Sequence, residues 1–348
     1  MKKVLYVVED TKSAQFRYRV KNVAEALGDS DYEVEWVMKS ELDGVDLDRY
    51  DLVVVLRQTD KDGVVGRFID SAHEVSKKVL FDLDDLIFDY RDVPILMRST
   101  NSKNVVYWVG YFWGVRRIAK KVDGFICTNK FLSGKLKRSF GKPVRVIRNS
   151  LNREQVEASE KCLGKKKHEG FVVGYFSGSP THKRDFELVE PELIRFLEKH
   201  EDARLRVVGY MRFSERMKEL ISAGRVEEMD IVDYLELQKL ISKADVNIAP
   251  LVINDFTNCK SELKFFEAGV VETTTIASPT YTFSKAITDG ENGYLAQPGE
   301  WYDKLEYLYN NPEVNRKVAI VAHKYALKHY YGKEFLKEVE EAYECFAK

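Results

Sequence analysis

Three carboxylates stand close together directly after an apolar run in the N-terminal half of the chain. The run ends at Phe81, and Asp82, Asp84 and Asp85 follow it. Crowded carboxylates raise one another's pKa, so one of them can act as a general acid or base, or accept a hydrogen bond from a hydroxyl. The same residues could bind a divalent cation, or cap the turn that follows a strand. We predict Asp82, Asp84 and Asp85 as catalytic candidates and leave their chemical role open.

Two arginines near the N-terminus form a second candidate group. Arg17 and Arg19 lie in the run Gln15–Arg19, which opens an expected helix after the first strand. A guanidinium at such a position can neutralise a phosphate or an acidic acceptor. The alternative is an exposed arginine pair whose stems pack along the helix surface. We predict Arg17 and Arg19 as acceptor or phosphate contacts.

Small residues end an apolar run in the C-terminal half. Ser177, Gly178 and Ser179 follow the run Phe171–Phe176, and an expected helix with Lys183 comes next. Small residues let backbone N–H groups approach an anion, and the start of a helix favours negative charge. An ordinary connection from strand to helix would have a similar composition. We predict that Ser177, Gly178 and Ser179 bind a phosphate of the ligand and that Lys183 or Arg184 contacts it directly.

A second group of possible ligand-binding residues lies on a helix expected over Lys260–Val271. On this helix Lys260, Lys264 and Glu267 share one stripe beside the apolar face. Lysines at a ligand site suit a diphosphate, and a carboxylate suits ribose hydroxyls. The alternative is a Lys–Glu pair on a solvated helix face. We predict Lys260, Ser261, Lys264 and Glu267 as donor-binding residues.

Alternating strands and helices must position these groups. Short apolar runs alternate with amphipathic segments along the chain, which indicates parallel sheets covered by helices. The alternation breaks between Asn149 and Gly170, where the chain is polar and charged. We therefore expect two Rossmann-like α/β domains, residues 1–165 and 166–330, that bind ligands at the carboxyl ends of their strands.

One expected helix, Asn104–Lys120, is unusually aromatic. Packing in the core is its favoured role. Aromatic faces also stack on sugar rings or lie at a membrane interface, so a contact with the acceptor stays open.

The composition argues against several classes of partner and site. With 55 Lys and Arg against 56 Asp and Glu, the formal net charge is −1, which argues against a nucleic-acid partner. The four cysteines are scattered without metal-ligand spacing, so we expect no metal site and a reducing, cytoplasmic location. The N-terminal apolar run is too short for a signal peptide, and no run approaches the roughly 20 apolar residues of a membrane span. A peripheral contact with the inner face of a membrane stays open.

The C-terminal half resembles the GT-B glycosyltransferase family, which includes many retaining sugar transferases. The resemblance rests on segments in the family's order and spacing, namely Gly174–Asp185, Leu205–Gly209, Ala244–Leu251, Lys260–Gly269, Ile276–Pro279 and Asp289–Gly293. It implies two Rossmann-like domains around an active cleft. It also implies transfer of a sugar from a nucleoside-diphosphate sugar to a hydroxyl of a glycan, lipid-linked or other acceptor.

The resemblance carries over to single positions. It implies that Glu267 binds the donor ribose and that the turn at Ser177–Ser179 holds the diphosphate. It also implies that a last helix, residues 331–348, packs back onto the N-terminal domain. GT-B relatives generally need neither a metal nor a prosthetic group.

The sequence departs from the family pattern at Cys259. The family usually carries a glutamate at this position, eight residues before Glu267, close to the transferred sugar. The usual proline before the next strand is also replaced, by Thr273 or Thr274. The retaining or inverting outcome therefore stays open. Three alternatives also stay open: a catalytically inactive nucleotide-sugar-binding protein, a GT-B phosphorylase or epimerase, and a glycosyltransferase acting on nucleic acid.

Overall fold

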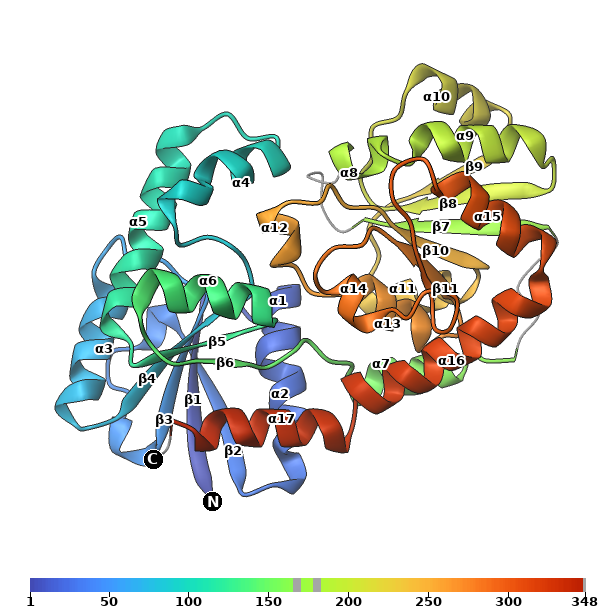
Figure 1. Ribbon diagram of the computed structural model, residues 1–348. Coiled ribbons are helices and arrows are strands. Elements are labelled where there is room, and N and C mark those ends of the chain that lie inside the picture. The colour runs from blue at the N-terminus through green and yellow to red at the C-terminus, as the bar shows by residue number, and fades with distance from the viewer. Residues whose placement is uncertain (165–169, 178–182, 347–348) are drawn as a thin grey trace. The chain divides into compact units, whose positions relative to one another are not determined.

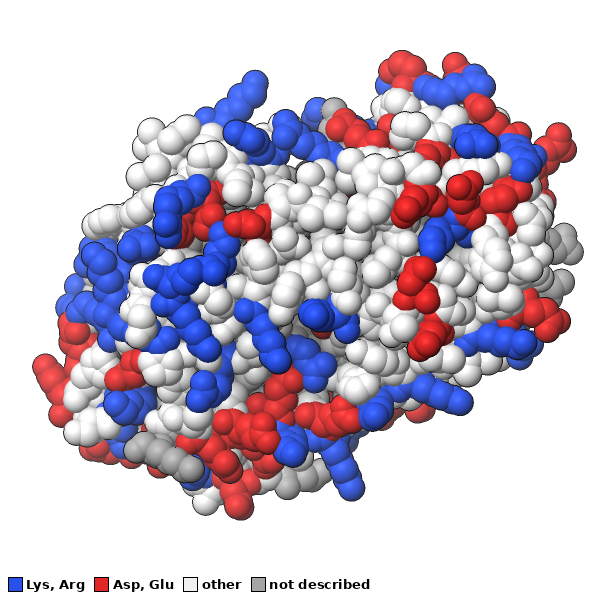
Figure 2. Space-filling model, in the orientation of Figure 1, with Lys and Arg blue, Asp and Glu red and all other residues white. Residues whose placement is uncertain are grey.

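The chain forms two compact units (Figure 1). The computed structural model describes residues 1–164, 170–177 and 183–346. The first unit contains Met1–Asn152, Asn258–Ser261 and Tyr330–Lys348, and the second contains Arg153–Thr257 and Glu262–His329. Figure 2 shows charged side chains of both signs on the face in view, with uncharged surface between them, in keeping with the near-zero net charge.

The first unit is built on a six-stranded parallel sheet with the order β2-β1-β3-β4-β5-β6. Its strands are β1 (Lys2–Val8), β2 (Tyr32–Met38), β3 (Leu52–Leu56), β4 (Lys78–Leu83), β5 (Gly124–Cys127) and β6 (Val144–Val146). Its α-helices are α1 (Ala14–Phe16), α2 (Asn22–Ala26), α3 (Val64–Glu74), α4 (Val93–Ser99), α5 (Val105–Lys121), α6 (Lys130–Phe140) and α17 (Lys333–Glu344). A π-helix, Arg17–Lys21, joins α1 to α2. Single turns of 3₁₀-helix cover Leu27–Asp29, Lys39–Glu41, Leu47–Arg49 and Tyr90–Asp92.

Continuous apolar runs explain the centre of this sheet. All five residues of β3 are buried, and five of the six residues of β4 are buried. A strand covered by helices on both faces needs apolar side chains at every position, not at alternate ones. The predicted parallel sheet is therefore confirmed. The helix expected after the first strand is present, with the π-helical stretch Arg17–Lys21 between α1 and α2.

The C-terminal helix α17 completes the core of the first unit. The hydroxyls of Tyr343 on α17 and Tyr6 on β1 are 2.6 Å apart and buried. Burial raises the pKa of Tyr343 well above its ordinary value, so the pair is a neutral hydrogen bond. A Cβ at Gly124 would lie 2.3 Å from the ring of Phe346, so a side chain at residue 124 would displace that ring.

The second unit is built on another six-stranded parallel sheet, with the order β12-β11-β10-β7-β8-β9. Its strands are β7 (Phe171–Phe176), β8 (Ala203–Val208), β9 (Val226–Met229), β10 (Val246–Ala249), β11 (Thr274–Ala277) and β12 (Tyr294–Leu295). Its helices are α7 (Arg153–Glu160), α8 (Lys183–Glu187), α9 (Glu190–Lys199), α10 (Glu215–Ser222), α11 (Tyr234–Ser242), α13 (Leu263–Gly269), α14 (Phe283–Ala286), α15 (Trp301–Asn310) and α16 (Pro312–Tyr330). A short helix, α12 (Asp255–Asn258), leads from this unit into the segment Asn258–Ser261.

The core of the second unit lies between its sheet and the helices α9 and α15. Phe196 and Leu197 of α9 pack with Trp301 and Leu305 of α15 against strands β7 and β8. Within the described ranges, no helix is both long enough and apolar enough to cross a membrane.

Candidate functional site

The turns after β7 and β8 meet at the carboxyl edge of the second sheet. Ser177 directly follows β7, is buried, and donates its N–H to the carbonyl of Val208 at 2.8 Å. Gly209 follows β8 with a φ of +98°, and a Cβ there would lie 1.8 Å from the Ser177 carbonyl oxygen. Only glycine fits this close approach. The backbone at Ser177 is therefore held from the neighbouring strand.

Several of the predicted phosphate contacts cannot be placed. Gly178 and Ser179 lie outside the described residues, and Lys183 begins α8 with a side chain that is not described. On the next turn, Asp185 accepts a hydrogen bond from the N–H of Val252, which follows β10, at 2.9 Å. This bond fixes α8 beside the carboxyl edge of the sheet.

Glu267 is a buried carboxylate on α13. Its side chain is 8% exposed, and Gln155 Nε2 of α7 donates to its Oε1 at 3.4 Å. Gln238 Nε2 of α11 donates to the Glu267 carbonyl oxygen at 3.3 Å and to Ser159 Oγ at 3.0 Å. Buried carboxylates need polar partners, and the Gln155 amide is one for this side chain, while Gln238 binds the main chain of the same residue. The carboxylate is thus held in a defined position.

Lys264 lies one turn before Glu267 and beside β7. Its Nζ is 4.5 Å from the ring centroid of Tyr175, two residues before Ser177. Its carbonyl oxygen accepts a hydrogen bond from Asn247 Nδ2 of β10 at 2.9 Å. A cation over an aromatic face is attracted by the electron-rich ring. The structure therefore places the Lys264 ammonium group near the carboxyl end of β7.

Lys260 and Ser261 do not share the helix of Lys264. The predicted helix over Lys260–Val271 is wrong at both ends, because α13 covers only Leu263–Gly269. Asn129 Nδ2, which belongs to the first unit, donates to the carbonyl oxygen of Cys259 at 2.7 Å. This carbonyl is therefore bound by a distant side chain just before α13. Lys260 and Ser261 belong to the first unit, whereas Lys264 belongs to the second.

Asp82 and Arg19 form an ion pair in the interior of the first unit. Both side chains are 1% exposed, and Arg19 Nε lies 3.1 Å from each carboxylate oxygen of Asp82. Arg19 Nη1 also donates to the Ile147 carbonyl oxygen at 2.5 Å and to Asn149 Oδ1 at 3.2 Å. Burial raises the pKa of Asp82 to about 6, while the charge of Arg19 opposes this rise. The pair ties β4 and the π-helix to the segment after β6, and neither charge faces solvent.

Arg17 points elsewhere, although it lies in the same π-helix. Its guanidinium is 4.3 Å from the ring centroid of Tyr18, and its side chain is half-buried. A π-helix inserts an extra residue into each turn. The two predicted arginines consequently have different environments.

Asp84 and Asp85 form a compensated charge cluster with residues that lie far away in sequence. Arg57 Nη1 is 2.9 Å from Asp84 Oδ1 and 2.9 Å from Asp85 Oδ2, and Lys260 Nζ is 3.6 Å from Asp85 Oδ1. Burial alone would raise the pKa of Asp85. The positive charges of Lys260 and Arg57 outweigh this effect, so the pKa lies below its ordinary value. An ionised carboxylate can accept a hydrogen bond or a proton, whereas it cannot serve as a general acid. No three His, Cys, Asp or Glu side chains are grouped as metal ligands in the part of the chain described.

Arg57 is the member of this cluster that sequence reasoning missed. It follows β3 with a φ of +28°, and its N–H donates to the Asp82 carbonyl oxygen at 2.9 Å. Non-glycine residues rarely adopt such a φ, and those that do gather at functional sites. A charged residue directly after the fully apolar run Leu52–Leu56 is the signal that could have identified it.

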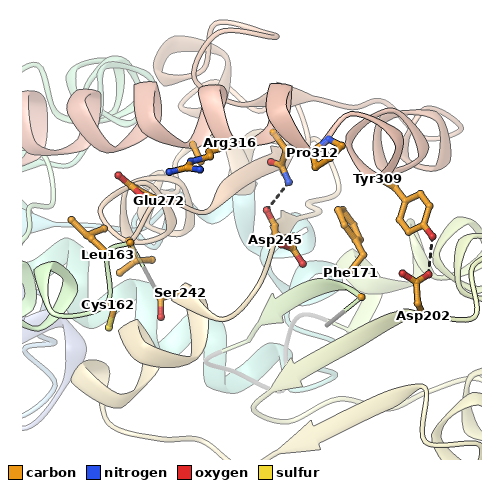
Figure 3. Close-up of a pocket in the computed structure, with 15 residues that line it drawn as sticks. Cys162, Leu163, Phe171, Asp202, Ser242, Asp245, Glu272, Tyr309, Pro312 and Arg316 are labelled. Atoms are coloured by element: carbon orange, nitrogen blue, oxygen red, sulfur yellow. Dashed lines mark hydrogen bonds between the residues drawn. The ribbon is translucent and has the colours of Figure 1, made fainter. Parts of the chain in front are cut away.

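A cavity of about 720 Å³ lies at the opposite edge of the second sheet (Figure 3). Phe171 begins β7 and Asp245 directly precedes β10, so this cavity faces the amino ends of the strands. The hydroxyl of Tyr309 donates to Asp202 at 2.7 Å at its rim. Parallel sheets bind ligands at their carboxyl ends. The cavity is therefore not where the sequence places the donor.

Comparison with solved structures shows the fold of the whole chain. Anabaena HepE in complex with UDP and glucose is 15% identical, with a TM-score of 0.62, and 99% of each chain is covered. Sucrose-phosphate synthase of Thermosynechococcus elongatus is 14% identical, with a TM-score of 0.68 and 99% of each chain covered. A glycosyltransferase of Rickettsia africae is 14% identical, with a TM-score of 0.66, covering 100% of this chain and 99% of its own.

Comparison with sequences gives a narrower result. No curated protein sequence gives a significant match. The family model described as glycosyl transferases group 1 matches residues 172–311, which include Ser177, Lys264 and Glu267. The predicted GT-B fold is confirmed, whereas the retaining subtype stays open. The chain therefore has the GT-B fold, and residues 172–311 match the group 1 glycosyl transferases.

Proposed function

We propose that the protein transfers a sugar from a nucleoside-diphosphate sugar to a hydroxyl of an acceptor. One observation carries the proposal. Within the segment that matches group 1 glycosyl transferases, a buried carboxylate and an ammonium group lie on α13, and the ammonium group lies beside β7 close to its carboxyl end. This edge of a parallel sheet is where such folds bind nucleotides.

The second unit is proposed to bind the donor. Glu267 accepts hydrogen bonds from the ribose hydroxyls; Gln155 orients its carboxylate, and Gln238 fixes its main-chain carbonyl. Lys264 and the backbone after Ser177 contact the diphosphate. Fixed positive charge at the leaving group stabilises the transition state, since negative charge grows there as the sugar departs. Lys264 supplies this charge, so we propose that a metal ion is not required.

The donor nucleotide is proposed to be uridine diphosphate. The structural relative HepE is seen in complex with UDP and with UDP-glucose. Within the proposed site, the Glu267 carboxylate suits the ribose and the Lys264 ammonium group suits the diphosphate of such a nucleotide. The titration described below compares uridine with the other bases.

The first unit is proposed to bind the acceptor. Arg57 holds both Asp84 and Asp85, and the lowered pKa of Asp85 keeps that carboxylate ionised, so this cluster can accept hydrogen bonds from acceptor hydroxyls. In the reaction the bond from the anomeric carbon to the diphosphate oxygen breaks, and a bond to the acceptor oxygen forms. The acceptor proton passes to a carboxylate of this cluster or to the departing phosphate. Asp82 and Arg19 take no part in this step and hold the end of β4 in position.

Calorimetric titration with UDP, GDP, dTDP and CDP tests donor binding directly. Glu267→Gln keeps the size of the side chain but removes its charge. Loss of a hydrogen bond to a charged group costs about 1.5–3 kcal/mol, so we expect Kd for UDP to rise about ten- to a hundredfold. The matched control is Glu201→Gln, an exposed glutamate of the same unit, which should leave Kd unchanged. Equal affinity of wild type and Glu267→Gln would remove Glu267 from the site.

A protein that binds nucleotide sugars without transfer is the second candidate. The position that usually carries glutamate holds Cys259, which is buried and whose carbonyl oxygen is bound by Asn129. Release of UDP from UDP-glucose, measured with a panel of sugar and lipid-linked hydroxyl acceptors, separates the two. Acceptor-dependent release supports transfer, and tight binding without release across the panel supports the second candidate.

A further inference from the structure

Large apolar side chains are exposed at the start of α5. The exposed fractions are 52% for Val105, 84% for Val106, 44% for Val109 and 46% for Trp113. These four residues are here called the α5 stripe. A helix turns about 100° per residue, so Val106, Val109 and Trp113 lie on one side of it. The opposite side of α5 is buried in the first unit, through residues such as Phe112 and Ile118.

Exposed basic side chains lie on α5 and on the segments next to it. Lys103 lies two residues before α5, Lys120 lies on its last turn, Arg98 lies on α4, and Lys61 precedes α3; none of the four forms an ion pair with a described residue. Lys61 Nζ is 5.7 Å from the ring centroid of Tyr107, which is itself 49% exposed. Two further cations nearby are already neutralised, because Arg117 pairs with Asp60 and Lys121 with Asp70.

The local charge differs from that of the whole chain. The segment 91–121 holds seven Lys and Arg but a single acidic residue, Asp92, whose side chain is buried. The whole chain has a net charge of −1. Figure 2 shows Lys and Arg side chains over α5 and α6, next to uncharged surface over the start of α5. The segment that carries the exposed apolar residues is therefore positively charged.

This combination suits the surface of an anionic bilayer. Trp and Tyr favour the boundary between acyl chains and headgroups, and aliphatic side chains enter the acyl region. Lys and Arg beside them attract anionic headgroups. We propose that the α5 stripe inserts into the headgroup region of an anionic lipid membrane, with Lys61, Arg98, Lys103 and Lys120 at the level of the phosphates.

The contact is shallow and reversible. Three valines and one tryptophan bury too little apolar surface to hold the chain on a neutral membrane. Attraction between basic residues and anionic lipid must add to them, and dissolved salt screens this attraction. Binding should therefore require anionic lipid and weaken as the salt concentration rises.

Sedimentation of the full chain with lipid vesicles tests the proposal without any nucleotide. Vesicles of phosphatidylcholine alone are compared with vesicles that also contain phosphatidylglycerol. We expect binding to the mixed vesicles only. Val106→Glu combined with Val109→Glu should lower the partition coefficient by at least about tenfold, because two carboxylates would enter the apolar region. The matched control is Ile231→Glu, which changes a 63% exposed residue of the second unit and should leave binding unchanged.

A charge variant tests the second part of the proposal. Lys103→Glu combined with Lys120→Glu should abolish the preference for phosphatidylglycerol, whereas Lys317→Glu on α16, also exposed, should not. Circular dichroism and UDP titration of each variant show that it is folded. Vesicle binding is read independently of UDP binding, so the failure of one proposal does not imply the failure of the other.

Three results would overturn the proposal. The first is a wild-type chain that does not bind the mixed vesicles. The second is binding that survives the two valine substitutions, or that Ile231→Glu reduces equally. The third is concentration-dependent dimerisation of the wild-type chain, lost on substitution of Val106 and Val109 and without vesicle binding, because the stripe would then be a contact between copies of the chain.

Discussion

A substitution in the buried pair of Arg19 and Asp82 tests whether Asp82 stabilises the fold or takes part in catalysis. Asp82→Asn keeps the shape of the side chain but leaves the guanidinium of Arg19 without a counter-charge. Arg19 would keep its bonds to the Ile147 carbonyl and to Asn149, and would lose the ionic contacts at 3.0–3.1 Å. Removing one member of a buried ion pair costs about 3–5 kcal/mol. Because two bonds remain, and because burial raises the pKa of Asp82 and so disfavours its carboxylate in the folded state, we expect a smaller loss, about 1–3 kcal/mol.

Unfolding in guanidinium chloride, followed by hydrogen exchange of peptides from β1, β3 and β4, measures this loss of stability in the first unit alone. A domain is stable by about 5–15 kcal/mol, so the variant should still fold. The double substitution Arg19→Met with Asp82→Leu should be less destabilised than either single one, because it leaves no unpaired charge. The control is Asp70→Asn in the same unit, which breaks an exposed pair with Lys121 and should cost less than about 0.5 kcal/mol.

The opposite result has a clear meaning. If Asp82→Asn remained within about 0.5 kcal/mol of wild type and lost transfer activity, Asp82 would be a catalytic group and the structural assignment would be wrong.

Three further expectations follow from single contacts. Hydrogen bonds from Arg91 lower the pKa of Asp89 to about 2, so the carboxylate stabilises the fold above pH ~4, and this contribution disappears as the pH falls through about 2. Asp89→Asn should therefore lower the free energy of unfolding by roughly 1 kcal/mol at pH 7, a small loss because Arg91 is exposed, and should have no effect at pH ~2. Denaturant unfolding at both pH values measures the difference. Gly209→Ala should destabilise the second unit by about 2–3 kcal/mol, because its Cβ would collide with the Ser177 carbonyl, whereas Gly44→Ala, which meets no atom within 4 Å, should cost about 1 kcal/mol in thermal unfolding. EDTA should leave UDP affinity unchanged, because Lys264 supplies the positive charge; loss of binding that Mg²⁺ restores would refute this.

The sequence was informative where the signal is local. Apolar runs such as Leu52–Leu56 mark strands buried on both faces, and their alternation with amphipathic segments predicts two parallel sheets. The helix expected over Asn104–Lys120 agrees with α5, Val105–Lys121, to one residue at each end. Hydrophobic period and composition determine such elements within a short window.

Long-range contacts between side chains could not be predicted from the sequence. Asp82 and its neighbour Asp84 have the same residue type, yet Asp82 meets Arg19 in the core while Asp84 meets Arg57 near the surface. Helix propensity likewise placed Lys260 on the helix that in fact begins at Leu263. The Cys259 carbonyl, just before this helix, accepts a hydrogen bond from Asn129, which lies 130 residues away in sequence. Local patterns carry no information on such partners.

Hydrogen exchange of the full chain with and without saturating UDP tests the central claim most directly. A ligand that binds the native state slows the local opening of the segments that contact it. We expect slower exchange in peptides that cover Ser177 at the end of β7 and Leu263–Gly269 of α13, and no change in peptides around Asp202 and Asn315 at the amino edge. Unchanged exchange at both edges, or slower exchange confined to the amino-edge peptides, would contradict a donor site at Lys264 and Glu267.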